Sequence, residues 1–186
     1  ILDRRWKNED IVKSLKVPHK YGIKFSVNNI TGFPYETKKL AFDTIELNRH
    51  IESDNQNIFT FVPFHGTPLR KTCEDLGLIK PETITTCVTT DDAQINMSQY
   101  PPHEIKEVIR TFNLYVKFPK KRWKEIERAE KEDDEGNRIY QILKKEFLEK
   151  YMPKPYANPH GGLEDHVFHA KSNNDISKSL HQDEIV

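Results

Sequence analysis

The chain has 186 residues, in which 29 lysines and arginines balance 29 aspartates and glutamates. This balance argues against nucleic-acid binding driven by net charge, and no apolar run approaches the roughly 18 residues needed to cross a bilayer. We therefore expect a soluble, cytoplasmic protein whose partners include neither a membrane nor a nucleic acid. Because charged residues make up 31% of the chain and hydrophobic residues 35%, we also expect long solvated helices or a disordered tail beside the core.

The first predicted elements are a short helix and a strand. Asn8 is a suitable cap for a helix over residues 9–17, and we expect Pro18 to end that helix. Apolar residues then alternate over residues 23–30, which predicts a strand. A Gly- and Pro-containing turn follows this strand directly.

A second strand-loop-helix unit follows. Glu36 and Thr37 start a helix whose apolar side is expected to pack on the sheet. Residues 57–62 are nearly all β-prone, as in a strand that is covered on both faces. A helix over residues 68–76 then ends at Gly77, a residue typical of helix C-termini. Two such units in tandem predict an α/β fold with parallel strands, in which ligands bind at the carboxyl ends of the strands.

The second half of the sequence predicts a loop and a helical extension. Residues 80–102 form a long irregular connection, and a connection of that length usually covers a site or is mobile. Residues 103–116 carry apolar side chains at spacings of three and four, and burying them contributes on the order of 9–18 kcal/mol before the entropy of ordering is subtracted. Further helices are expected near Trp123 and over residues 136–151. The polar, Pro- and Gly-rich segment after Met152 predicts a tail.

The turn at residues 32–37 is the first candidate ligand site. Exposed backbone amides at a strand end, together with Glu36, are suited to hold a polar ligand. The alternative is a plain connection, in which Pro34 fixes the turn and Thr37 favours the start of the helix. A second turn of the same kind, over residues 63–68, strengthens the first interpretation, and both remain open.

Two motifs in order resemble radical S-adenosylmethionine (SAM) enzymes. Residues 30–37 read Ile-Thr-Gly-Phe-Pro-Tyr-Glu-Thr, and residues 61–69 read Phe-Val-Pro-Phe-His-Gly-Thr-Pro-Leu. In the branch of that family whose members carry an upstream cobalamin-binding domain, one strand ends in Gly-Phe-Pro-Gly-Glu-Thr. After a helix, the next strand of that branch ends in aromatic residues and Pro-Gly-Thr-Pro. This chain departs from the pattern at Tyr35, where the family has glycine, and at His65, which precedes Gly66.

The resemblance implies the C-terminal part of a partial, TIM-like radical SAM barrel over residues 1–80. A loop and an α-helical extension follow over residues 81–152, and a disordered tail over residues 153–186. The resemblance also implies SAM as a cofactor that is bound by both strand-loop units. The residues implied to bind it are Asn28, Ile30, Gly32 and Glu36 in the first unit and Phe61, Val62, Pro63 and Phe64 in the second.

In the complete enzyme, the resemblance implies reductive cleavage of SAM at a [4Fe-4S] cluster, for radical chemistry on an unidentified substrate. Cobalamin is an additional cofactor of this branch. The cluster-binding loop of the family, Cys-x-x-x-Cys-x-x-Cys, is absent from the sequence. Cys73 and Cys87 lack the clustered spacing that an iron-sulfur centre requires, and we interpret both as ordinary reduced thiols. We therefore interpret Ile1 as a position partway through the parent barrel, with the missing N-terminal half as the expected partner.

Two other clusters are alternative sites. Histidines and acids in the tail are of the types that bind a divalent metal, but this unpatterned, Gly-rich segment favours a solvated tail, and we predict no metal site. A basic and aromatic run is of the kind that contacts nucleic acid or phosphate, although the acidic run after it favours a solvated face. The tail residues are His160, Glu164, Asp165, His166 and His169, and the basic run contains Lys117, Phe118, Lys120, Lys121, Arg122, Trp123 and Lys124.

The main alternative function is a non-catalytic α/β-helical module that docks a partner through the apolar face of residues 105–116. It predicts a monodisperse protein, whereas part of a barrel exposes strand edges and is expected to aggregate or to need its missing half. A hydrolase or transferase is a weaker alternative, since no nucleophile-base pair, nucleophile elbow, P-loop or dinucleotide-binding glycine motif is found.

Overall fold

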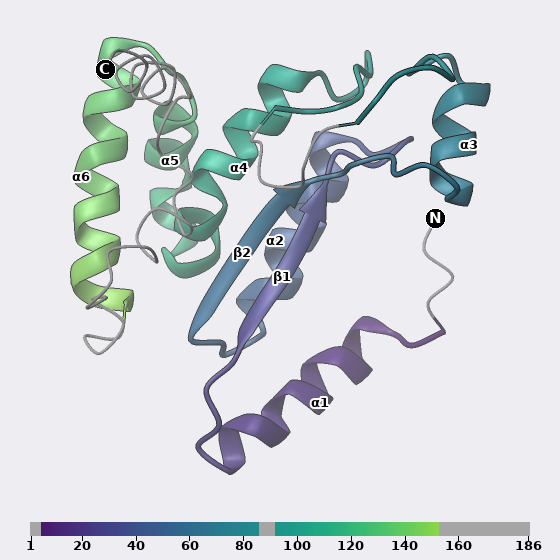
Figure 1. Cartoon of the computed structure of the whole chain (residues 1–186). Helices are drawn as coiled ribbons and strands as arrows, with labels where there is room; N and C mark the ends of the chain where they lie inside the picture. The colour runs from purple at the N-terminus through teal and green to yellow at the C-terminus, as the bar shows by residue number, and fades with distance from the viewer. Residues whose placement is uncertain (1–4, 86–91, 153–186) are drawn as a thin grey trace, which may run out of the picture. The chain divides into compact units, whose positions relative to one another are not determined.

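The structure is a computed structural model that describes residues 5–85 and 92–152. The chain divides into two compact units, Ile1–Met152 and Pro153–Val186, and every described residue belongs to the first. The predicted tail, its histidine cluster and Cys87 lie outside the described residues. The described part belongs to the mixed α/β class, as predicted, and Figure 1 shows its elements.

The first helix, α1 (Asn8–Lys20), is longer than the predicted one. Its N-cap is Lys7 rather than Asn8, and the Asp10 carboxylate accepts a hydrogen bond from the Lys7 backbone N–H (3.1 Å). The prediction that Pro18 ends the helix is wrong. Pro18 lies in the last turn, where its missing N–H removes only one backbone hydrogen bond close to the helix end.

Two parallel strands, β1 (Ser26–Thr31) and β2 (Asn55–Thr60), form a sheet and are connected by helix α2 (Lys38–Arg49). The strand β1 begins later than the alternation predicted, and β2 begins earlier. Thr37 caps α2, because its hydroxyl accepts a hydrogen bond from the Leu40 N–H (3.3 Å). This β-α-β unit confirms the predicted parallel arrangement.

The sheet has one covered face and one open face. On the covered face, Asn29 of β1 exchanges hydrogen bonds with Asn48 of α2 (2.8 and 3.2 Å), and Ile58 of β2 is buried. The prediction that residues 57–62 are covered on both faces is wrong, since burial alternates along β2. No second layer of described residues packs on the other side. The open face consists of Ser26, Asn28 and Ile30 from β1 and Asn55, Asn57 and Phe59 from β2.

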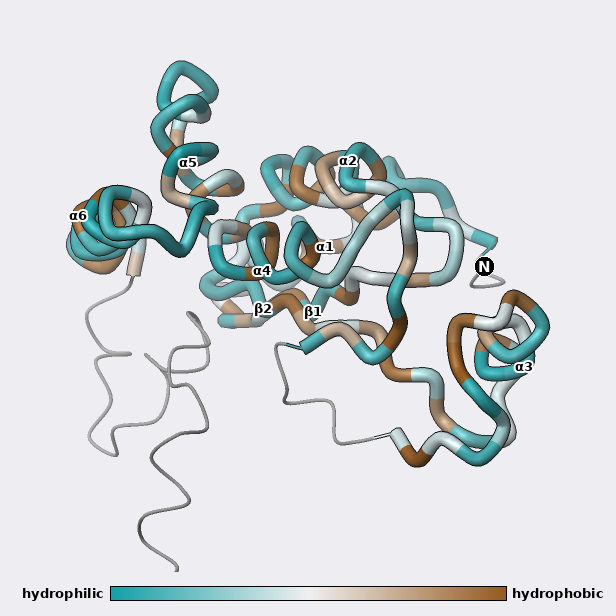
Figure 2. The backbone as a smooth tube through the Cα atoms, turned by 90° about the horizontal axis from the view of Figure 1, so that it is seen from above, coloured by the Kyte–Doolittle hydropathy of each residue, from teal (hydrophilic) through white to brown (hydrophobic). Residues whose placement is uncertain are grey.

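Helix α4 (Pro102–Lys117) forms the centre of the core, as its apolar periodicity predicted. It packs against α2 and β2 and against two later helices, α5 (Trp123–Ala129) and α6 (Asp134–Tyr151). Phe112 of α4 is fully buried. The colouring in Figure 2 shows that α2 and α4 both alternate hydrophobic and hydrophilic residues around their axes, as amphipathic helices do.

The apolar face over residues 105–116 is not a docking surface, contrary to the alternative drawn from the sequence. Ile105, Val108 and Phe112 have no exposed area, because neighbouring elements of the same chain cover them. The periodicity correctly indicated an interface, but that interface lies inside the chain.

Two short elements complete the described part. Helix α3 (Pro68–Asp75) follows the turn after β2, and Thr67 caps it by accepting a hydrogen bond from the Arg70 N–H (3.2 Å). A 3-10 turn, η1 (Lys120–Arg122), leads into α5. Among the described residues, no helix combines the length and the apolar character required to cross a membrane.

Buried polar contacts fix the helical extension to the sheet layer. Glu130, which is 1% exposed, accepts hydrogen bonds from the Tyr115 hydroxyl (2.6 Å) and from Lys38 Nζ (2.7 Å). Burial would lower the pKa of Lys38, but the hydrogen bond and the charge of Glu130 raise it above its usual value. The Arg49 guanidinium also donates to three backbone carbonyls at the end of α4, the shortest of them at 2.6 Å.

Candidate functional site

The turn that follows β1 is organised by the carboxylate of Glu36. Glu36 Oε2 accepts hydrogen bonds from the backbone N–H groups of Gly32 and Phe33 (3.0 Å for Phe33) and from the Thr31 hydroxyl (3.3 Å). The Glu36 N–H in turn donates to the Phe33 carbonyl (3.0 Å). Glu36 is only 7% exposed, so its carboxylate shapes the turn from within.

Burial raises the pKa of Glu36 above its ordinary value. The hydrogen bonds from Phe33, Gly32 and Thr31 act in the opposite direction, because they stabilise the charged form, but they do not cancel the cost of burial. The carboxylate is therefore less stable in the folded chain than in water. Its acceptor capacity is directed to the turn's own backbone, which makes Glu36 a positioning residue.

Gly32 lies close to Ile105 of α4. Its φ of +88° is favourable only for glycine, and a Cβ at this position would lie 3.3 Å from Ile105 Cδ1. Conformation and space therefore both explain why a glycine stands at this position of the predicted turn. Contact with Ile105 was not predicted from the sequence.

Tyr100 is a second residue of this turn that sequence reasoning missed. It has no exposed area, and its hydroxyl lies 3.4 Å from Thr31 Oγ1. Because the Thr31 hydroxyl donates its single proton to Glu36, the Tyr100 hydroxyl is the donor to Thr31. Burial raises the pKa of Tyr100, which keeps this donor protonated. No signal in the sequence around Tyr100 indicates a partner 69 residues away.

The turn after β2 lies beside the first turn. The Phe61 N–H donates to the Thr31 carbonyl (2.7 Å), which continues the pairing of the two strands by one bond. Arg70, 3% exposed, donates to the Pro63 carbonyl (3.2 Å) and to the Thr83 carbonyl (2.9 Å). Sequence reasoning missed Arg70, which ties the turn to the start of the following loop.

The eight residues predicted to bind the cofactor divide into three groups. Asn28 and Ile30 lie on the open face, with Asn28 accepting a hydrogen bond from Asn57 Nδ2 (2.8 Å), and Ile30 is 46% exposed. The turn residues Gly32 and Glu36 are buried, and so are Phe61, Val62 and Pro63, whereas Phe64 is 48% exposed. The structure therefore places all of the set except Asn28, which lies in the middle of β1, at or just after the carboxyl ends of the two strands. Only three of the side chains are exposed: Asn28, Ile30 and Phe64.

The described residues do not fit an iron-sulfur cluster. Such a cluster requires several thiolates close together. Cys73 is buried in α3, where burial raises the pKa of its thiol, and no group of three His, Cys, Asp or Glu residues in the described part is placed to hold a metal ion. Among the eight residues, Ile30 and Phe64 are the exposed apolar side chains, at 46% and 48%.

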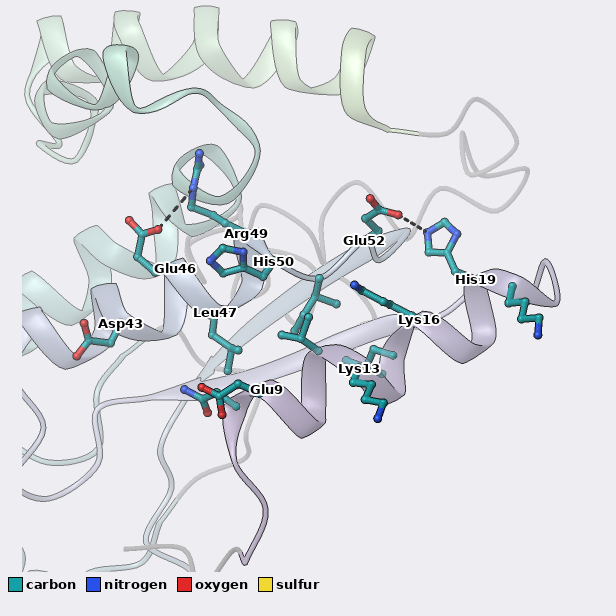
Figure 3. A pocket seen from close by; sticks show the side chains of 15 residues that line it. Glu9, Lys13, Lys16, His19, Asp43, Glu46, Leu47, Arg49, His50 and Glu52 are labelled. Carbon is teal, nitrogen blue, oxygen red and sulfur yellow. Dashed lines mark ion pairs between the residues drawn. The ribbon is translucent and has the colours of Figure 1, made fainter.

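A groove of about 1080 Å³ lies elsewhere, between α1 and the C-terminal half of α2 (Figure 3). Its lining mixes acidic and basic side chains, and two pairs of them lie within ion-pair distance: His19 with Glu52 (3.8 Å) and Arg49 with Glu46 (3.9 Å). No set of polar groups converges on one point in the groove. We therefore place the candidate site at the strand ends and not in this groove.

Part of the basic run at residues 117–124 is paired inside the fold, whereas Lys120, Lys121 and Lys124 are exposed. Arg122 donates to Glu125 (2.8 Å) and Glu146 (2.6 Å), and Lys117 Nζ donates to the Ser53 carbonyl (3.3 Å). Burial lowers the pKa of Lys117. These contacts give Lys117 and Arg122 structural roles, and the three exposed lysines agree with a solvated face.

Comparisons with known proteins give no match to this chain. No family model matches it, and neither a curated protein nor a solved structure shows significant similarity.

Gly32→Ala is expected to lower the free energy of unfolding by about 2 kcal/mol, through backbone strain at positive φ and crowding against Ile105. Gly66→Ala is the matched control, because Gly66 also has a positive φ (+78°) but would place its Cβ in open space. We expect a loss of about 1 kcal/mol there. Urea unfolding measures both, and equal losses would show that the contact with Ile105 is not tight.

Glu36→Gln is expected to remove a pH dependence of stability. Because the pKa of Glu36 is higher in the folded than in the unfolded chain, the folded state binds more protons from its ordinary pKa of 4.5 up to the raised value. The free energy of unfolding of the wild type therefore falls as the pH rises through this window, and that fall is absent from the variant. Urea unfolding across this pH range measures the difference.

A control of opposite sign is Asp133→Asn, since the hydrogen bond from Arg128 lowers the pKa of Asp133. Because this pKa is lowered, the free energy of unfolding of the wild type rises with pH as Asp133 loses its proton. Asp133→Asn should remove that rise, whereas Glu36→Gln should remove a fall. If Glu36→Gln leaves the pH profile of the wild type unchanged, Glu36 does not carry a raised pKa.

Proposed function

We propose that this chain is the ligand-binding later part of an α/β barrel. The observation that carries the proposal is the pair of turns at the carboxyl ends of two adjacent parallel strands, one of them held by the buried carboxylate of Glu36. Ligands of parallel α/β folds bind at these strand ends. The open face of the sheet then corresponds to the interior of the barrel, and the helix-covered face to its outer ring.

More specifically, we propose the later part of a radical SAM barrel, of the branch with an upstream cobalamin-binding domain. Three structural features support the motif resemblance. The glycine of the first motif needs its positive φ, the glutamate of that motif binds the turn's amides, and the isoleucine before the glycine is exposed on the open face. Cobalamin remains an expectation from the resemblance alone.

In this proposal Ile30 and Phe64 supply apolar contacts to SAM, and Gly32 lets the end of β1 turn closely against Ile105. Glu36 fixes the amides of the turn, assisted by Thr31. Phe61, Val62 and Pro63 support the second turn from within the fold, because all three are buried. When bound and reduced by one electron, SAM supplies a carbon radical, and the protein's part is to bind and orient it.

The cluster that reduces SAM in this family has no ligand set in the chain. The proposal therefore requires cysteine ligands from outside these 186 residues, and additional strands to continue the sheet. Two parallel strands pair only with each other in the described part, so both outer edges are available for further strands. An unpaired edge of this kind makes the isolated chain prone to association.

The test is SAM cleavage by the protein expressed from its complete reading frame, purified and reconstituted anaerobically. We expect formation of 5′-deoxyadenosine on addition of dithionite, and at least a tenfold loss in Ile30→Asp at unchanged iron content. The loss follows because the carboxylate of the variant would have to give up its hydration against the adenosyl group of the ligand. Leu40→Asp is the matched control, since Leu40 is equally exposed (48%) but lies on α2.

Two results would contradict the proposal. One is a reconstituted protein that holds no cluster and forms no 5′-deoxyadenosine. The other is an Ile30→Asp variant that cleaves SAM at the same rate as wild type and Leu40→Asp, because then the strand end of β1 is not in the ligand site.

A further inference from the structure

Tyr35 occupies a backbone position that favours glycine. The Glu36 N–H donates to the Phe33 carbonyl (3.0 Å), Pro34 is the second residue of the turn, and Tyr35 as the third has φ +68°. These are the features of a type II turn, whose third residue is usually Gly or Asn. Tyr35 is the one described residue other than glycine with a positive φ. A tyrosine in this conformation strains the backbone.

Packing within the described part of the chain does not compensate for this strain. The Tyr35 side chain is 59% exposed. Its ring stacks on no other described aromatic residue, and its hydroxyl makes no hydrogen bond to the rest of the described chain. Because most of the ring is exposed and the described part of the chain provides neither aromatic stacking nor a hydrogen bond for it, we look for the role of the ring in contacts outside the fold.

The two turns at the strand ends carry exposed apolar side chains besides Tyr35. Ile30, near the end of β1, is 46% exposed, and Phe64, in the turn after β2, is 48% exposed. The two turns contact each other, because Phe33 and Phe61 stack with ring centroids 5.0 Å apart. The nearest carboxylate in sequence, Glu36, is turned inward to the backbone amides. Exposed aromatic and aliphatic side chains at one edge favour a flat, uncharged ring over a charged group.

We propose that Tyr35 is a specificity-determining residue that contacts a planar heteroaromatic ring of the ligand bound at the strand ends. The inference rests on the proposed ligand site, but it depends on a residue at which the chain departs from the family pattern. Aromatic contacts of this kind contribute about 0.5–1.5 kcal/mol, which corresponds to a change in affinity of about two- to twelvefold.

The experiment is an NMR titration of the protein expressed from its complete reading frame, with adenosine as the ring-containing probe and ribose as the ring-free probe. Wild type and Tyr35→Phe should bind adenosine with upfield shifts of the ring protons of residue 35. Tyr35→Gly and Tyr35→Asn should bind adenosine about fivefold more weakly, since both tolerate the turn but lack a ring. Ribose should bind equally weakly to all four proteins.

Thermal unfolding of the same proteins separates a ligand role from a structural one. Relief of strain in Tyr35→Gly offsets the greater freedom of glycine in the unfolded chain, so its melting temperature should stay level or rise by up to about 3 °C. A clear fall in melting temperature would show that the ring is needed for folding and would overturn the inference.

The binding outcomes also distinguish this inference from the proposed function. If adenosine shifts Ile30 and Phe64 and binds Tyr35→Gly as tightly as wild type, the site stands and the role of Tyr35 is refuted. If adenosine shifts no residue at the strand ends, both the proposed site and the role of Tyr35 are contradicted.

Discussion

The structure depends on the carboxylate of Glu36, which is buried so that it can bind the backbone of its own turn. Without that acceptor, the amides of Gly32 and Phe33 would be buried next to apolar side chains with no partner, at a cost of about 1–3 kcal/mol each. The carboxylate thus fixes where β1 ends and how the chain enters α2. The same carboxylate also accepts a hydrogen bond from the Thr31 hydroxyl, and the Tyr100 hydroxyl donates to Thr31 in turn. Three groups therefore depend on this acceptor directly, and Tyr100 depends on it through Thr31.

The helical extension holds this turn from outside. The side chain of Ile105, on the first turns of α4, fills the space beside Gly32, and Tyr100 just before α4 reaches Thr31. The far end of α4 is bound by Arg49, at the end of α2. Because α4 is fixed at both ends to the β-α-β unit, the extension is part of the site's support and not an independent module.

The local features of the fold were accessible from the sequence, whereas contacts between distant segments were not. Alternation and turn residues located both strands and α2, and a spacing of three and four located α4. Pro18 was misjudged because a proline near a helix end costs little. The prediction that residues 57–62 are covered on both faces was wrong because an apolar run can have two origins. It can be a strand that is buried on both faces, or a strand followed by a buried loop. Here Phe61 and Val62 belong to a buried loop after the end of β2.

In the candidate site, too, local features could be predicted from the sequence, whereas contacts between distant segments could not. The motifs predicted that Gly32 and Glu36 belong to one turn, and their spacing of four residues explains why one carboxylate can reach the amides at the start of that turn. Tyr100 and Arg70 could not be predicted, since their roles come from hydrogen bonds to the backbone or to a hydroxyl far along the chain. Tyr35 was visible as a departure from a motif, but its positive φ and exposed ring appear only in three dimensions.

The open face of the sheet is the feature by which the whole account is most directly tested. In the middle of this face Asn57 donates a hydrogen bond to Asn28, and near the carboxyl end of β1 the face carries the exposed Ile30. Such a mixture of polar and apolar side chains suits a barrel interior that admits a ligand better than it suits a surface packed against protein. The decisive measurement is a crystal structure of the protein from its complete reading frame, grown anaerobically with SAM. The account predicts the adenosyl group against Ile30, at the carboxyl ends of β1 and β2. A structure in which a protein layer covers Asn28 and Ile30, or in which SAM lies elsewhere, would contradict it.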